Sequence, residues 1–139
     1  MKAFLDISVL VPVFLADHAH HRASLDTFLR FKKQESSCAA HSLAETYSTL
    51  TRLPGRHRVS GEQAMLFLGE IRERLTLVAL DEAEYYTSIE RAAGRGMRGG
   101  AIYDAILASC ALKIKADTLY TWNLKHFQQL ELFDRIRTP

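Results

Sequence analysis

The chain of 139 residues contains few of the residues that cross-link or interrupt a fold, with two cysteines, three prolines and seven glycines. Cys38 and Cys110 are too few for a disulfide framework, a composition that suits the reducing cytosol, so we expect a cytoplasmic protein. The low glycine and proline content excludes collagen-like and low-complexity chains. No apolar run approaches the roughly 20 residues of a membrane span, so we expect no membrane partner.

The net charge is also small, because 18 Lys and Arg residues face 16 Asp and Glu residues and give +2. Such a mildly basic balance permits nucleic-acid binding without demanding it. What the chain does have is 47% hydrophobic residues and enough length for a real core. No repeat and no linker divides it, so we predict a single domain over residues 1–139.

Short apolar runs alternate with helix-like patterns along the whole chain. We predict strands at residues 2–6, 37–40, 75–80 and 118–121, with a last edge strand at 132–136. We predict helices at residues 8–17, 25–33, 41–53, 60–71 and 81–93, one after Gly99 and Gly100, and a short one within 122–127. Such alternation predicts an α/β fold, with helices on both faces of a mostly parallel sheet of four or five strands.

Two helix starts carry local signals. Ser8 is predicted to cap the first helix, in which Pro12 is tolerable only near the first turn. Ser60 and Gln63 stand at capping-box spacing before the helix that contains Ile71.

Four polar residues fall at one predicted edge of this sheet, where the carboxyl ends of the strands bind ligands. Asp6 ends the first strand, Glu45 lies early in the helix after the second strand, and Asn123 follows the fourth strand. Asp104 lies in the first turn of an otherwise uncharged helix. Three carboxylates cannot crowd together unpaired, and a hard cation such as Mg²⁺ or Mn²⁺ resolves the repulsion. The chemistry indicated is metal-assisted phosphodiester hydrolysis.

Each of these residues also has a simpler explanation when taken alone. Asp6 is acceptable as a strand-end turn residue, and Asp104 as a capping residue near a helix start. Glu45 is acceptable as a solvated helix residue, and Asn123 as a turn residue. The combination at one rim, rather than any single residue, is what favours a metal site.

Four segments, in this order, resemble the motifs of a known family. They are Phe4–Leu10, Ala44–Tyr47, Ile102–Ala108 and Leu119–Phe127. The chain resembles PIN-domain ribonucleases, specifically the VapC-type toxins of bacterial and archaeal toxin–antitoxin pairs. The resemblance implies a three-layer α/β/α sandwich and an endoribonuclease that depends on Mg²⁺ or Mn²⁺. It also implies a cognate VapB-like antitoxin, an RNA substrate and a homodimer.

The resemblance assigns roles to individual residues. Asp6, Glu45 and Asp104 would be the acidic residues of the site, with Asp6 and Asp104 as metal ligands, while Ser8 and Thr121 match supporting polar positions. Many such nucleases carry a fourth acid at the position of the fourth catalytic candidate, Asn123. An amide oxygen adds no charge, so one metal or two stays open. An RNA-processing nuclease without an antitoxin and an inactive antitoxin-binding homologue also stay open.

Other motifs carry less weight. The spacing of Gly94, Gly96 and Gly99 matches a dinucleotide fingerprint, but it follows a helix instead of a strand. Arg95 and Arg98 in this loop are candidates for weak RNA binding or antitoxin contact, and a solvated loop is the alternative.

Two further readings are less favoured. His18, His20 and His21 lack the spacing of a zinc site and are read as surface residues. A phosphoacceptor receiver domain needs an acidic pair after its first strand, where this chain has Ile7 and Ser8 after Asp6. The apolar faces of the predicted helices at 8–17 and 41–53 favour a homodimer and a groove for an antitoxin segment.

Overall fold

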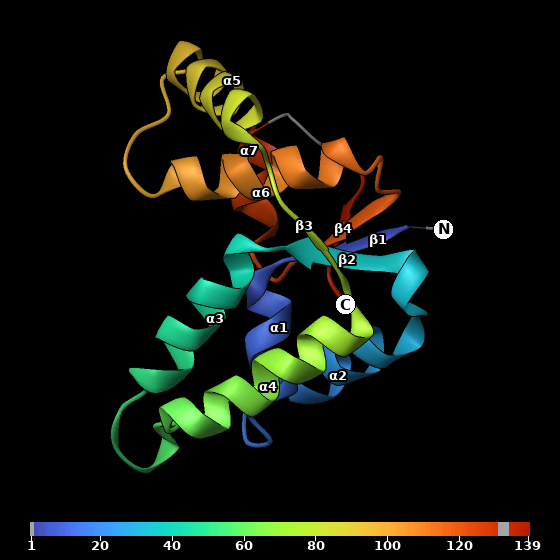
Figure 1. The fold of residues 1–139 in the computed structure, drawn as a ribbon, viewed down its shortest axis with the longest axis vertical. Helices are drawn as coiled ribbons and strands as arrows, with labels where there is room; N and C mark the ends of the chain where they lie inside the picture. The colour runs from blue at the N-terminus through green and yellow to red at the C-terminus, as the bar shows by residue number, and fades with distance from the viewer. Residues whose placement is uncertain (1, 131–133) are drawn as a thin grey trace.

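The computed structural model describes residues 2–130 and 134–139, and within them five parallel strands form one sheet in the order β3-β2-β1-β4-β5 (Figure 1). The strands are β1 (Ala3–Leu5), β2 (Ser36–Ala39), β3 (Thr76–Val78), β4 (Thr118–Tyr120) and β5 (Ile136–Arg137). The seven described α-helices are α1 (Ile7–Val13), α2 (His21–Arg30), α3 (His41–Thr51), α4 (Gly61–Arg74), α5 (Glu82–Gly94), α6 (Ala101–Lys113) and α7 (Leu124–Leu130). Two 3₁₀ turns, Lys33–Glu35 and Gly55–His57, complete the described elements.

The sheet separates two hydrophobic cores, so the architecture is the predicted α/β/α sandwich. In Figure 1, α5, α6 and α7 lie above the strands and α1 to α4 lie below them. Phe4 and Leu119, paired across β1 and β4, belong to the core beneath α6 and α7. Leu5 and Tyr120, the next pair, belong to the core beneath α1, α2 and α4. Apolar side chains therefore alternate between two covered faces, as expected for a parallel sheet.

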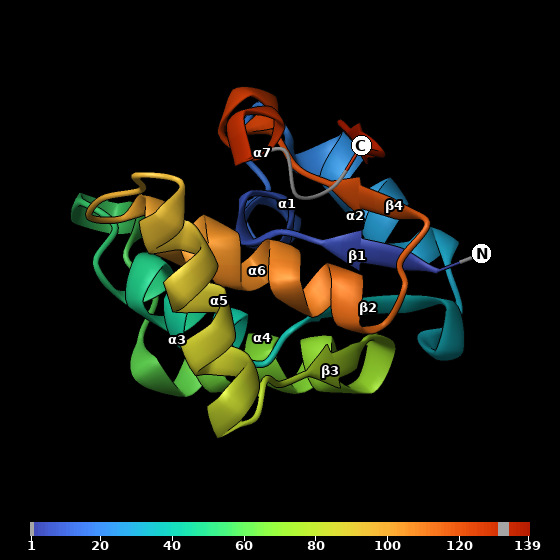
Figure 2. The same cartoon turned by 90° about the horizontal axis from the view of Figure 1, so that it is seen from above.

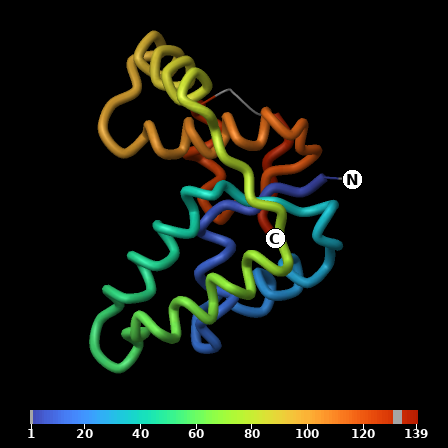
Figure 3. Tube along the Cα trace, in the orientation of Figure 1, coloured from blue at the N-terminus to red at the C-terminus, as the bar shows by residue number. Residues whose placement is uncertain are grey.

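The order of the strands places a crevice between β1 and β4. The chain leaves β1 toward β2 and β3 and then returns through α6 to β4 on the other side of β1, a path that can be followed in Figures 2 and 3. This reversal is a topological switch point, where the loops after neighbouring strands diverge and leave room for a ligand. The residues that follow β1 and β4 are therefore the ones best placed for function.

The first helix differs from its prediction in three ways. It spans Ile7–Val13 instead of 8–17, and Asp6, not Ser8, is its N-cap residue. The carboxylate of Asp6, two positions before Ser8, accepts from the backbone N–H of Ser8 at 3.3 Å. Pro12 lies near the C-terminal end of the helix, not in the first turn. Pro12 has no N–H to donate to the carbonyl of Ser8, four residues earlier, and the helix ends at Val13.

Several local signals are confirmed. Ser60 caps α4 by accepting from the backbone N–H of Gln63 at 3.1 Å. The helix α6 begins at Ala101, directly after the two glycines, and Gly99 has a φ of +58°. Both cysteines are free and buried. Of the predicted strand at 132–136, residues 132 and 133 lie outside the described residues, and β5 begins at Ile136.

Some apolar surface is left uncovered, and of the two predicted helices only α3 contributes to it, through Tyr47, which is 39% exposed. The apolar residues Val9, Leu10 and Val13 of α1 are buried within the chain itself. The most exposed large apolar side chains lie instead on α4 and α5, with Leu66 71% and Tyr86 72% exposed. Within the described ranges, none of the helices has the length and apolar character needed to traverse a bilayer.

Candidate active site

The candidate site lies at the carboxyl ends of β1 and β4. Asp6 directly follows β1 and is only 2% exposed, and its backbone N–H donates to the carbonyl of Tyr120 at 3.0 Å. Thr121, which directly follows β4, is completely buried beside it. Strand pairing therefore fixes the backbone on both sides of the crevice before any side-chain contact is considered.

Two hydroxyl groups hold the carboxylate of Asp6 in the same way. Ser8 Oγ accepts from the backbone N–H of Trp122 at 2.9 Å, and Thr121 Oγ1 accepts from that of Asn123 at 2.9 Å. Each hydroxyl lies close to Asp6 Oδ2, Ser8 at 2.7 Å and Thr121 at 2.8 Å. Since a hydroxyl has a single proton and already accepts from a backbone N–H, both are positioned to donate to Asp6. The two predicted supporting residues thus orient the buried acid.

Opposing effects act on the charge of Asp6. Burial raises the pKa of its carboxyl group, and this is the larger effect. The hydrogen bonds from Ser8 and Thr121 lower the pKa, because they favour the charged form. A nearby cation would therefore stabilise the charged form of this buried, oriented carboxylate more than that of an exposed one.

Glu45 projects toward the same region from the second turn of α3. Its pKa is raised first by burial and then by the negative charges of Asp6 and Asp104, while His41, one turn earlier, lowers it. Glu45 Oε1 lies 3.6 Å from His41 Nε2, beyond hydrogen-bond distance. Among the described residues, this buried oxygen has no hydrogen-bond partner. A buried carboxylate oxygen without a donor needs a cation or an ordered water.

Asp104 completes the acidic group from the first turn of α6. Burial and the charge of Asp6 raise the pKa of its carboxyl group, and His126 on α7 lowers it from 3.6 Å away. The amide-bearing Asn123 is exposed and lines, together with Asp104 and His126, an open cavity of about 640 Å³. The three acids thus lie near enough for Asp6 to raise the pKa of the other two, and Asn123 lines the same cavity as Asp104.

The donor set fits a hard divalent cation. Within the described part of the chain, no group of three or more His, Cys, Asp or Glu side chains lies close enough together to hold a metal ion. Mg²⁺ does not need such a group, because it keeps several waters and binds through one or two carboxylates. The orphaned oxygen of Glu45 and the mutual repulsion of the three acids are the features that such an ion would relieve.

The structure also locates the weaker candidates. Arg95 Nη1 donates to the carbonyl of Leu130 at 2.6 Å, so this guanidinium ties the loop after α5 to the end of α7. Arg98 is exposed in the same loop. Gly96, within the glycine motif, has a φ of +75° and follows helix α5, so it forms a turn after a helix and not a strand–helix phosphate loop.

The two flanking histidines were not among the sequence candidates. His41 precedes Glu45 by four residues on one helix, a spacing that places both on the same face and offered a usable signal. His126 lies on α7, 22 positions from Asp104 along the chain, and no local pattern links them.

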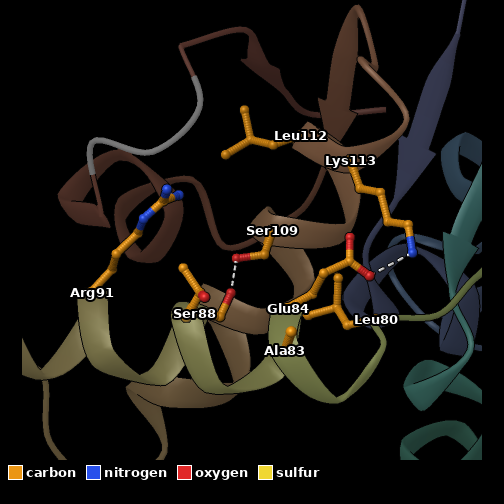
Figure 4. A pocket seen from close by; sticks show the side chains of 9 residues that line it. Leu80, Ala83, Glu84, Ser88, Arg91, Ser109, Leu112 and Lys113 are labelled. Atoms are coloured by element: carbon orange, nitrogen blue, oxygen red, sulfur yellow. Dashed lines mark hydrogen bonds and ion pairs between the residues drawn. The ribbon is translucent and has the colours of Figure 1, made fainter.

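A second cavity, of about 390 Å³, lies between α5 and α6 and contains none of the candidate residues (Figure 4). Lys113 Nζ donates to Glu84 Oε1 at 2.7 Å along one wall, and the hydroxyls of Ser88 and Ser109 meet at its floor. These contacts join the two helices to each other, and they explain how polar side chains are accommodated there.

Comparison with known proteins agrees with this geometry. The family model described as PIN domain matches residues 3–131. Ribonuclease VapC40 of Mycobacterium tuberculosis is 33% identical over 132 residues, which cover 95% of this chain and 92% of the relative. Ribonuclease VapC27 of the same organism is 32% identical over 113 residues, 81% of this chain and 79% of the relative.

Solved structures share the fold at lower sequence identity. The crystal structure of Mycobacterium tuberculosis VapC20, described as a Sarcin-Ricin loop cleaving toxin, superposes with a TM-score of 0.73 at 17% identity, over 92% of this chain and 95% of the other. VapBC2 from Rickettsia felis, bound to a promoter DNA fragment, gives a TM-score of 0.69 at 18% identity over both whole chains. The chain therefore belongs to the PIN-domain family, and its relatives there are of the VapC type.

Proposed function

We propose that this protein is an endoribonuclease that depends on Mg²⁺ or Mn²⁺ and acts as the toxin of a toxin–antitoxin pair. The observation that carries the proposal is the convergence of Asp6, Glu45 and Asp104 from three separate segments, with a buried and unpartnered oxygen among them. The ribonuclease names of VapC40 and VapC27 support the choice of RNA as the substrate.

The surroundings of each side chain suit it to a different role. Asp6 and Asp104 are the residues that would hold the cation, Asp6 because two hydroxyl donors fix its orientation. When bound, the cation would lower the pKa of a coordinated water and offset charge on the phosphate. Glu45, whose pKa is raised by burial and by its acidic neighbours, is suited to accept a proton from the attacking water. Asn123 would offer an amide oxygen at the rim without adding negative charge.

The test is cleavage of a single-stranded RNA by purified protein, free of any partner, with and without Mg²⁺. Asp6→Asn and Asp104→Asn are expected to lower the cleavage rate by at least about 100-fold, since each removes a charged ligand. Asp26→Asn is the matched control, because Asp26 is an exposed acid on α2 paired only with Arg22 among the described residues. Unchanged cleavage by both site variants, with folding intact, would contradict the proposal.

The antitoxin partner is part of the proposal. It is supported by the structural neighbours, which include the VapBC-1 complex of nontypeable Haemophilus influenzae, with a TM-score of 0.66 at 18% identity, over 99% of this chain and 98% of the other. A small DNA-binding protein encoded beside this chain is expected to co-purify with it and to suppress cleavage. If no such partner is needed to restrain cleavage in cells, an RNA-processing nuclease is favoured instead.

A homodimer is also proposed, and we place its contact on the exposed apolar residues of α4 or α5. Leu66 and Tyr86 are the most exposed of them. The mass of the particle in solution, measured by light scattering, is expected to be twice that of the chain, and Leu66→Glu or Tyr86→Glu is expected to halve it. A monomeric mass for the unmodified protein would contradict this part of the proposal.

A further inference from the structure

A cavity of about 430 Å³ lies beside the acidic site, and metal binding alone does not account for it. It lies between α1, the loop before α2 and the segment after β4. Ser8 and Asn123 line it, and both also belong to the hydrogen-bond network around Asp6. Its volume falls in the range of small-ligand sites, so whatever occupies it lies directly next to the acids.

One wall of the cavity is a rigid aromatic pair. The rings of His20 and Trp122 stack with centroids 3.6 Å apart and planes inclined by 10°. The indole is held by the bond from Trp122 Nε1 to Ser24 Oγ at 2.9 Å, and the backbone N–H of Trp122 donates to Ser8 Oγ at 2.9 Å. Both rings are only half-buried.

The rest of the cavity combines apolar and hydrogen-bonding groups. Ile7 and Val11 of α1 supply apolar contact, and Thr49 of α3 supplies a hydroxyl. His18 Nδ1 accepts from the backbone N–H of His20 at 3.0 Å, so a proton on the neutral ring must be on Nε2. Burial and the neighbouring histidines lower the pKa of His18, which favours this neutral form. His18 thus brings a defined N–H donor to the cavity.

We propose that this cavity binds one unpaired nucleobase of the RNA, stacked against the His20–Trp122 pair, adjacent to the phosphate that is cleaved. The inference rests on the proposed ribonuclease function and deepens it by assigning a specificity subsite. Single-stranded RNA is recognised by stacking on aromatic side chains and by hydrogen bonds to base edges, and the cavity provides both.

An apolar side chain of a partner protein is the competing occupant. Flat stacked rings with a polar rim match a base better, because a base has a flat face and hydrogen-bonding edges, whereas an aliphatic side chain has neither. Asn123 lines both this cavity and the one that contains Asp104, so a base held here would lie beside the acidic site. The two occupants are separated by the experiment below.

Trp122 is the single tryptophan of the chain, so its fluorescence reports on this cavity alone. The unmodified protein, in EDTA to prevent cleavage, is titrated with six-residue single-stranded oligoribonucleotides and with an abasic oligomer of equal length. Base-containing oligomers are expected to quench the emission in a saturable way, and the abasic oligomer is expected to leave it unchanged. Equal quenching by both, or none by either, would overturn the proposal.

Variants test the stack with labelled RNA, followed by anisotropy. Trp122→Leu keeps apolar bulk without a flat face and is expected to weaken binding about 5- to 150-fold, the effect of losing one stacked base. Trp122→Phe keeps a ring and is expected to retain most of the affinity. His20→Ala, in a half-buried loop position that leaves the core intact, is expected to fall between them. Equal affinity for the Leu and Phe variants would refute stacking.

The two proposals fail separately. Binding and quenching are measured in EDTA, so a protein that never cleaves RNA still shows them if the base site exists. A protein that cleaves normally but shows no quenching by any base retains the ribonuclease function and loses the subsite. Quenching by an apolar peptide of the antitoxin, with none by RNA, would reassign the cavity to the protein partner.

Discussion

Replacing Thr121 by valine is a sharp test of how the site is built, because the two side chains have nearly the same shape. The hydroxyl of Thr121 lies 2.8 Å from Asp6 Oδ2 and accepts from the backbone N–H of Asn123 at 2.9 Å. Asp6 and Thr121 are at most 2% exposed, so bulk water cannot replace the lost hydrogen bond between them. We therefore expect a lower free energy of unfolding and a higher pKa of the Asp6 carboxyl group.

The size of the loss follows from the contacts. A hydrogen bond to a charged group contributes about 1.5–3 kcal/mol. Ser8 still donates to the same oxygen, and the N–H of exposed Asn123 can be hydrated, so we expect about 2 kcal/mol. For a chain of this length, that lowers the melting temperature by about 7 °C.

The pH dependence of the loss has a definite sign. The lost bond favours the charged form of Asp6, so its removal raises further a pKa that burial has already raised. The variant then binds a proton on Asp6 more readily when folded, and its deficit in unfolding free energy grows as the pH rises through that pKa. At pH values low enough to protonate Asp6, the deficit is expected to shrink.

Thr27→Val provides a matched control. Thr27 on α2 is also completely buried, but its hydroxyl has no hydrogen-bond partner among the described residues. Exchanging an unsatisfied buried hydroxyl for a methyl group is expected to be neutral or slightly stabilising. Urea and thermal unfolding in EDTA, at pH 5 and pH 8, measure both variants. A Thr121 variant as stable as the unmodified protein, or a Thr27 variant equally destabilised, would refute this reasoning.

Three other outcomes follow from the same structure. Glu45→Gln and Asp104→Asn are expected to raise the melting temperature in EDTA at pH 7.5 more than at pH 5, because the raised pKa of each acid makes its charged form destabilising. Asp26→Asn serves as the control, and a rise independent of pH counts against the explanation. Asn123→Asp is expected to lower the Mn²⁺ concentration for half-maximal cleavage, and an increase contradicts the role given to this position. Ser60→Ala, which removes the cap of α4, is expected to cost about 1 kcal/mol in urea unfolding with cleavage unchanged.

The sequence predicts the frame of the molecule because that information is local. An apolar run of a few residues marks β1, and a capping serine marks the start of α4. The placement of Asp6 at the end of a strand, together with the parallel topology, was enough to bring it to the same rim as Asp104. No tertiary contact had to be known for that step.

The hydrogen bonds within the site are not local, and only the resemblance to PIN-domain proteins indicated Ser8 and Thr121 as supporting residues. The bond between Thr121 and Asp6 spans 115 positions, and the bond between Trp122 and Ser24 spans 98. The resemblance to PIN-domain proteins placed Ser8 near the site, but local patterns made it a helix cap. Asp6 takes that cap because its carboxylate also accepts from Ser8 Oγ. Pairings of this kind depend on which strands become neighbours, a property of the whole chain.

The most direct test of the central claim is the position of a bound cation. Crystals grown with millimolar Mn²⁺ and measured at a wavelength where manganese scatters anomalously locate the ion without assumptions. We predict a peak about 2.0–2.6 Å from carboxylate oxygens of Asp6 and Asp104, with Glu45 reaching it directly or through water. A peak elsewhere on the molecule, with none between these acids, would contradict the account.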